Sequence, residues 1–190
     1  LSNLYNTELT CSRLKEVDKK CGLDRLWIGT SLDGLESCHD NTRGVSGAFH
    51  NFNRTLSQIR RDFPGLPVTV NFTLTTSNYK DLYAAYIFCK ENNLTVSVQF
   101  PVAWVDAEKF VFTKEMMDSI EAQILRMIED EVKDFEAGKL DENALMAKVF
   151  YLSGMVEYKK APSRVFKKCA MGRKIAIFSP EGRVYFCPIL

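Results

Sequence analysis

The sequence predicts an α/β fold: part of a TIM-like (βα) barrel with parallel strands, followed by helices and a small C-terminal β-hairpin. Two observations carry this prediction. Strand-like segments alternate with helical segments of a dozen or more residues, and each strand-like segment has one apolar and one polar face. Long crossovers between consecutive strands imply a parallel sheet. Strands of a doubly wound sheet are apolar on both faces, so the polar faces favour a barrel lumen.

Each of three predicted strands follows a helical segment. The predicted order is a helix at 9–20, a strand at 26–33, a helix at 47–63, a strand starting at Pro67, a helix at 78–92 and a strand at 94–100. The second strand alternates strictly, because Val68, Val70 and Phe72 are separated by threonine and asparagine. One face of this strand is therefore expected to pack against helices.

The polar faces of the three strands are expected to share one surface. They contribute Ser31, Asp33, Asn71, Thr73, Ser97 and Gln99. In a barrel this surface is the lumen, where polar residues near the carboxyl ends of strands mark a ligand site. The alternative is a polar sheet face exposed to solvent.

The pattern changes after Pro101. Apolar residues at helical spacing predict one long helix over about 117–135 and a second over 142–158. Two strand-like segments, 174–179 and 183–187, are joined by Pro180-Glu181-Gly182, which has the composition of a hairpin turn.

Composition excludes several classes of function. The net charge is +1, which disfavours binding to nucleic acid or to an anionic membrane, and no apolar stretch is long enough to span a bilayer. The sequence contains no Gly-rich phosphate loop, so a nucleotide-binding domain is the least favoured class. The irregular spacing of the cysteines indicates reduced thiols and a cytoplasmic protein; they are Cys11, Cys21, Cys38, Cys89, Cys169 and Cys187.

Several short motifs resemble the radical SAM (S-adenosylmethionine) superfamily. The segment Ser31-Leu32-Asp33-Gly34 is followed by His39-Asp40, Arg43-Gly44 and Gly47-Ala48-Phe49, in the order found around the fourth barrel strand of that family. The next strand, from Val70 to Thr75 with Asn78 after it, also fits. Upstream, Ser2-Asn3-Leu4 resembles the turn that ends the third strand, with Leu4 in place of a glycine.

A second resemblance lies near the C-terminus. Cys169, Gly182 and Cys187 have the spacing that opens SPASM and twitch auxiliary-cluster domains. The two resemblances together imply three regions: the C-terminal half of a radical SAM barrel (1–113), a helical connection (114–168) and the start of an auxiliary-cluster domain (169–190).

The resemblance implies roles for individual residues, and each has an alternative. Ser31 would bind the ribose or amino-acid part of SAM, and Arg43 would pair with the SAM carboxylate or else clamp Asp40 or a helix end. Asp33 would contact ligand or close the turn before Gly34. Asn71 and Gln99 would bind SAM or substrate, or would be satisfied buried amides.

The cysteine and histidine residues are interpreted in the same way. Cys169 and Cys187 would be iron ligands of an auxiliary 4Fe-4S cluster, or two unligated thiols. We expect His39-Asp40 to lie on a loop and to have a structural role. No catalytic residue is assigned, because neither a serine–histidine–aspartate grouping nor a zinc signature is present.

The implied function is that of a radical SAM oxidoreductase or maturase. The Cys-x3-Cys-x2-Cys motif that holds the reducing 4Fe-4S cluster in that family is missing from this sequence, so we expect a fragment that is inactive alone. The full-length protein would cleave SAM to a 5′-deoxyadenosyl radical and modify a peptide, protein or small molecule, with a reductant such as flavodoxin or ferredoxin. The alternative is a non-catalytic α/β module that binds a ligand or acts as a scaffold.

Overall fold

A computed structural model describes residues 2–100, 111–160, 176–179 and 181–185 of the chain. The chain divides into two compact units, Leu1–Ser153 and Gly154–Leu190. The first unit contains a parallel sheet and most of the helices. The three regions predicted from the resemblance stay predictions.

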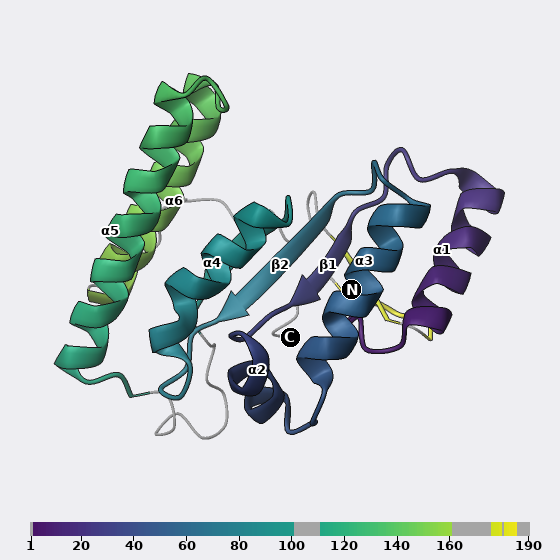
Figure 1. Cartoon of the computed structure of the whole chain (residues 1–190), viewed down its shortest axis with the longest axis horizontal. Coiled ribbons are helices and arrows are strands. Elements are labelled where there is room, and N and C mark those ends of the chain that lie inside the picture. The colour runs from purple at the N-terminus through teal and green to yellow at the C-terminus, as the bar shows by residue number, and fades with distance from the viewer. Residues whose placement is uncertain (1, 101–110, 161–175, 180, 186–190) are drawn as a thin grey trace. The chain divides into compact units, whose positions relative to one another are not determined.

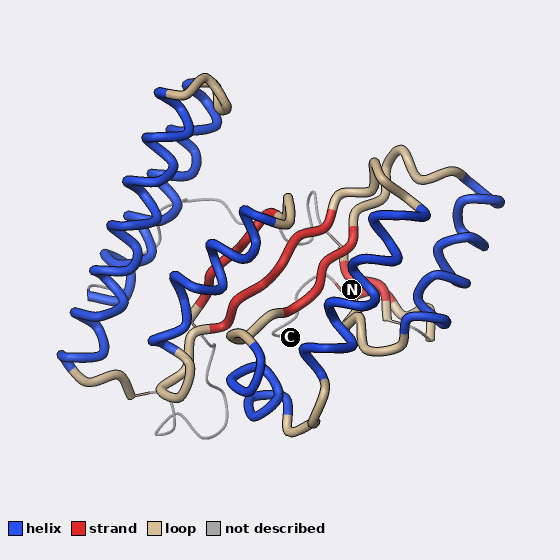
Figure 2. The backbone as a smooth tube through the Cα atoms, viewed as in Figure 1, coloured by secondary structure: helices blue, strands red, loops and turns tan. Residues whose placement is uncertain are grey.

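The sheet of the first unit has three parallel strands in the order β1-β2-β3. They are β1 (Ile28–Ser31), β2 (Val68–Thr73) and β3 (Thr95–Gln99). Helices connect the consecutive strands, as Figure 2 shows. The predicted α/β class and the parallel pairing are therefore confirmed. Within the described residues the strands form an open sheet, so the barrel stays a prediction.

Helices α3 (Ala48–Asp62) and α4 (Leu82–Glu91) lie against the same face of this sheet (Figure 1). The apolar side chains of β2 are buried on that face, because Val68, Val70 and Phe72 are at most 2% exposed. Each fully buried side chain of this kind contributes roughly 2 kcal/mol. Helix α1 (Thr7–Cys21) packs beside α3, and the short 3-10 helix η1 (Tyr79–Asp81) leads into α4.

A short helix, α2 (Glu36–Arg43), occupies the connection after β1. The expectation of a loop at His39-Asp40 is therefore wrong. The eight residues of α2 are mostly polar and lack an apolar stripe, which is why the pattern did not predict a helix. Contacts with other elements stabilise it instead, and Gly44 ends it in a left-handed conformation (φ 66°).

The start of the chain lies along the free edge of β1. The Ser2 amide donates to the Gly29 carbonyl at 2.9 Å. Leu4, which the resemblance aligns with a glycine, has a positive φ of 54° and a fully buried side chain. The backbone at this position is thus in the left-handed region that favours glycine, while burial of the leucine side chain offsets the strain.

Helices α5 (Lys114–Glu136) and α6 (Glu142–Lys160) follow the sheet, as predicted. A buried charge network holds them to α4. The Glu131 carboxylate is 3% exposed, accepts a hydrogen bond from the Tyr86 hydroxyl at 2.8 Å and pairs with Lys148 at 2.6 Å. Burial and the bond to Glu131 raise the pKa of Tyr86 far above its usual range, so this hydroxyl stays a donor.

None of the helices in the described ranges has the length and apolar character that crossing a membrane requires.

The second unit contains the predicted hairpin. Strands β4 (Ile177–Phe178) and β5 (Val184–Tyr185) pair antiparallel. Gly182 has a φ of 81°, and its amide donates to the Ser179 carbonyl at 2.9 Å, which closes the turn. Cys169 and Cys187, the predicted iron ligands, lie outside the described residues.

Gly34, at the turn from β1 into α2, should tolerate no side chain. Its φ is 138°, and an added Cβ would lie 2.4 Å from Cys38 Sγ and 2.7 Å from Cys38 Cβ. We expect Gly34→Ala to lower the free energy of unfolding by about 3 kcal/mol, through backbone strain and overlap together. Urea denaturation measures this loss.

Two other glycines provide controls for this substitution. Gly22 has a positive φ but open space around it, so Gly22→Ala should cost only about 1 kcal/mol from backbone strain. Gly65 has open space and no positive φ, so Gly65→Ala should change little. Equal losses at Gly34 and Gly22 would contradict the predicted overlap with Cys38.

Candidate functional site

A row of polar side chains crosses the sheet on the face opposite α3 and α4. Ser31, Asn71 and Ser97 are direct partners in the parallel register. All three are half-buried. Successive side chains of a strand alternate between faces, so Asn71 points to the face of the sheet opposite the buried Val70 and Phe72 of β2. The structure thus brings two predicted ligand-binding residues, Ser31 and Asn71, together.

A second polar pair lies one step closer to the carboxyl ends of the strands. Thr73 and Gln99 are register partners, and the Gln99 amide donates to the Thr73 hydroxyl at 3.0 Å. Gln99 therefore lies on the predicted face, but part of its hydrogen-bonding capacity is used within the sheet.

The far end of the polar row is bounded by a tyrosine of α6. The Tyr151 hydroxyl lies 3.1 Å from the Ser97 hydroxyl and donates to the Val98 carbonyl at the free edge of β3. Sequence reasoning missed this residue. Nothing in the pattern of α6 indicated which of its side chains would reach the sheet.

Asp33 lies just beyond β1 and is directed towards α2. Its carboxylate is buried, and Oδ2 is 2.6 Å from Arg43 Nε, a contact that forms an ion pair without the alignment of a hydrogen bond. Two predicted site residues thus pair with each other. The Arg43 side chain stays 37% exposed. Arg43 itself lies in the last turn of α2, and its predicted contact with SAM, like the alternative of a clamp on Asp40 or a helix end, stays a prediction.

His39 of α2 is buried beneath this ion pair. Its Nδ1 accepts a hydrogen bond from the Asp33 amide at 3.1 Å, and its ring lies near those of Phe49 and Phe52. Burial is the largest cause of a lowered His39 pKa, which keeps the imidazole neutral and able to accept this bond.

The adjacent Asp40 holds the start of α3. Its carboxylate accepts hydrogen bonds from the Gly47 amide at 2.6 Å and the Phe49 amide at 2.8 Å. These amides have no partner within the helix, and their bonds, that of Phe49 first, lower the pKa of Asp40. The histidine–aspartate motif is therefore accounted for by packing and helix capping.

Asn78 joins the carboxyl ends of β1 and β2. Its side-chain amide donates to the Asp33 carbonyl at 3.1 Å and to the Thr73 carbonyl at 3.0 Å, and its Oδ1 accepts from the Thr75 amide at 2.7 Å. The side chain is fully buried. The sequence placed Asn78 at the start of a helix and did not reveal that it bridges two strands.

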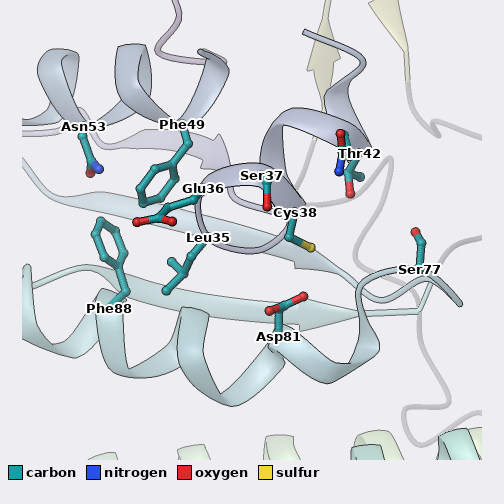
Figure 3. Close-up of a pocket in the computed structure, with 11 residues that line it drawn as sticks. Leu35, Glu36, Ser37, Cys38, Thr42, Phe49, Asn53, Ser77, Asp81 and Phe88 are labelled. Atoms are coloured by element: carbon teal, nitrogen blue, oxygen red, sulfur yellow. The ribbon is translucent and has the colours of Figure 1, made fainter. Parts of the chain in front are cut away.

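A groove of about 940 Å³ lies between α2, α3 and α4 (Figure 3). Phe49 and Phe88 line it, with ring centroids 5.7 Å apart, and Glu36 and Asp81 contribute carboxylates. Glu36 is in the first turn of α2 and Asp81 is the N-cap of α4, so both stabilise helix ends. Burial raises the pKa of the Cys38 thiol to about 12, which makes it a poor nucleophile.

In the described part of the chain, no three histidine, cysteine, aspartate or glutamate side chains are grouped so that they could hold a metal ion. The polar row itself offers hydroxyl and amide groups, which suit a neutral or zwitterionic polar ligand.

No family model matches the chain. One curated protein with a similar sequence is the Fe-coproporphyrin III synthase of Methanosarcina barkeri strain Fusaro, which is 33% identical over 82 residues. The match covers 43% of this chain and 18% of that protein. This distant similarity supports a link to the radical SAM superfamily and, weakly, an enzyme as the parent protein. It gives no support for an auxiliary-cluster domain.

The lowered pKa of His39 predicts that stability depends on pH. The unfolded chain takes up the proton near the ordinary value of 6.5, before the folded chain does. The contribution of His39 to the free energy of unfolding should therefore be fully present above that pH. Below it, the free energy of unfolding should fall by up to about 1.4 kcal/mol per pH unit. Urea denaturation between pH 5 and pH 7 measures the slope.

An asparagine at position 39 separates titration from packing. His39→Asn retains an acceptor for the Asp33 amide but cannot be protonated, so it should abolish this slope even if total stability falls. His50→Asn removes the other imidazole of the chain and should retain the slope, because His39 is still present. A slope that persists in His39→Asn would assign it to other groups.

The ion pair between Asp33 and Arg43 should also contribute to stability. Arg43→Gln leaves a carboxylate that is 6% exposed without a cation, and we expect a loss of about 2 kcal/mol, less than for a fully buried pair because Arg43 is partly exposed.

A double-mutant cycle tests whether the two side chains are coupled. Asp33→Asn combined with Arg43→Gln should cost less than the sum of the single changes, by at least about 1 kcal/mol. Lys20→Gln, which removes a cation from an exposed pair with Glu16, is the control and should leave unfolding nearly unchanged. Additive losses at Asp33 and Arg43 would contradict the coupling.

Proposed function

We propose that this chain forms the SAM-binding part of a radical SAM enzyme. The observation that carries the proposal is the alignment of Ser31 and Asn71 as register partners on the polar face of a parallel sheet. Ligands of α/β proteins bind at the carboxyl ends of parallel strands, and these two residues lie close to those ends. The distant similarity to a radical SAM protein supports the same reading.

The chemistry of the polar row fits SAM. The ligand carries ribose hydroxyls, an ammonium and a carboxylate, and Ser31 and Asn71 provide both donors and acceptors for such groups. Arg43 supplies a partly exposed guanidinium, held through Nε by Asp33, which is two residues after Ser31. In this proposal its remaining donors pair with the SAM carboxylate, while Asp33 positions the guanidinium. Gln99 contributes at the margin of the site, next to Thr73.

The iron-sulfur cluster of such an enzyme needs cysteines that this sequence does not contain at the required spacing. We therefore place the Cys-x3-Cys-x2-Cys motif in another part of a longer protein. When bound, the cluster would supply the electron that cleaves SAM to methionine and a 5′-deoxyadenosyl radical. The residues of this chain would bind and orient SAM for that step.

The finer features of the parent protein belong to the same proposal. They are an auxiliary 4Fe-4S cluster with Cys169 and Cys187 among its ligands, a reductant such as flavodoxin or ferredoxin, and a peptide, protein or small-molecule substrate. The resemblance of the C-terminal cysteines to SPASM and twitch domains is what supports the auxiliary cluster.

The test uses the full-length protein that contains this chain, reconstituted anaerobically with iron and sulfide. We expect reductant-dependent formation of 5′-deoxyadenosine from SAM. Ser31→Ala and Asn71→Ala should each weaken SAM binding about tenfold, the loss of one hydrogen bond to the ligand. Equilibrium dialysis measures the affinity, and liquid chromatography measures the product.

The chain offers a matched control for each variant. Ser57→Ala removes an exposed hydroxyl from α3, and Asn53→Ala removes an amide that lines the groove in Figure 3. Both should leave SAM affinity unchanged. If Ser31→Ala and Asn71→Ala also leave it unchanged, these residues do not form the site. A protein that binds no iron and yields no 5′-deoxyadenosine would instead be a non-catalytic α/β binding module.

A further inference from the structure

We propose that Asn78 is a positioning residue for the cofactor site. By tying the carboxyl ends of β1 and β2 together, it holds Ser31 and Asn71 at the spacing that SAM binding requires. This inference rests on the proposed function. Asn78 itself is fully buried and acts only through the residues it holds.

The hydrogen bonds of Asn78 start where the backbone ladder between β1 and β2 stops. The last backbone bond between them runs from the Leu32 amide to the Asn71 carbonyl at 3.1 Å. Beyond this point β2 keeps its pairing with β3 alone, and the Leu74 amide donates to the Gln99 carbonyl at 2.8 Å. The two donors of the Asn78 amide bridge the ends of β1 and β2 here.

Each bond of this bridge lies close to a residue of the polar row. The Asp33 carbonyl is two residues after Ser31, and the Thr73 carbonyl is two residues after Asn71. A shift of either strand end therefore moves one of the paired side chains relative to the other. Side-chain contacts with a ligand weaken steeply when donors and acceptors move from their preferred distances.

The same bridge connects to Arg43. The Asp33 carbonyl that Asn78 holds belongs to the residue whose carboxylate pairs with the Arg43 guanidinium. Asn78 thus fixes the backbone from which both the hydroxyl of Ser31 and the ion pair are presented. No aspartate could replace it fully, because an ionised carboxylate accepts the Thr75 amide but cannot donate to the two carbonyl groups.

The test is a double-mutant cycle for SAM binding in the reconstituted full-length protein, at a temperature where every variant is folded. Asn78→Ala should weaken SAM binding about tenfold. If Asn78 acts through Ser31, then adding Asn78→Ala to the Ser31→Ala variant should weaken SAM binding by a further factor of about two or less. Asn78→Ser, which retains a polar group and adds no buried charge, should weaken binding in the same direction and serves if the alanine variant does not fold.

A buried amide elsewhere provides the control for a purely structural role. Gln123 is 8% exposed, donates to the Tyr79 and Ser119 carbonyls and accepts from the Tyr83 amide. Gln123→Ala should lower the melting temperature but leave SAM affinity unchanged. Two results would overturn this inference. Asn78 variants could lower the melting temperature without changing SAM affinity, or their loss of SAM affinity could add fully to the loss caused by Ser31→Ala.

The outcomes also separate this inference from the proposed function. If Ser31→Ala and Asn71→Ala leave SAM affinity unchanged, the proposed site fails and the role of Asn78 fails with it. If they weaken binding while the Asn78 variants do not, the site stands and only the positioning role is overturned.

Discussion

Burial of one face of the central strand sets the register of the sheet, and the candidate site depends on that register. Val68, Val70 and Phe72 are buried, and α3 and α4 cover one face of the sheet (Figure 1). A slip of one residue would turn these side chains to the opposite face and put polar ones under the helices, at a cost of several kcal/mol. The alignment of Ser31, Asn71 and Ser97 on the other face is a direct consequence.

At the carboxyl ends of the strands, polar residues serve two different purposes. Asp33, His39, Asp40 and Asn78 are occupied with one another, with backbone groups or with Arg43, and they stabilise the turn, the short helix α2 and the start of α3. Ser31 and Asn71 lie on the polar strand face instead. The first group gives the connections their shape, and the second holds the residues of the proposed ligand site.

The helices after the sheet are integrated with it. Glu131 of α5 links Tyr86 of α4 to Lys148 of α6, and Tyr151 of α6 reaches the free edge of β3. A helix side chain thus binds a carbonyl on the edge of β3 that faces away from β2. This contact also places Tyr151 beside Ser97, so the region predicted as a connection contributes to the boundary of the polar row.

The sequence alone determined the α/β class, the order of the strands and of the longer helices, and the two faces of each strand, because alternation at period two and helical spacing are local properties of the chain. It also identified Ser31 and Asn71 as residues of one shared face. Local patterns could not predict α2, whose polar residues form a helix through contacts with the turn after β1 and with α3. Only the tertiary structure paired Asp33 with Arg43, brought Tyr151 to β3 and made Asn78 a bridge between strands. Each of these contacts joins residues that are distant in sequence or on separate elements, so their geometry exists only once the strands have paired and the helices have packed.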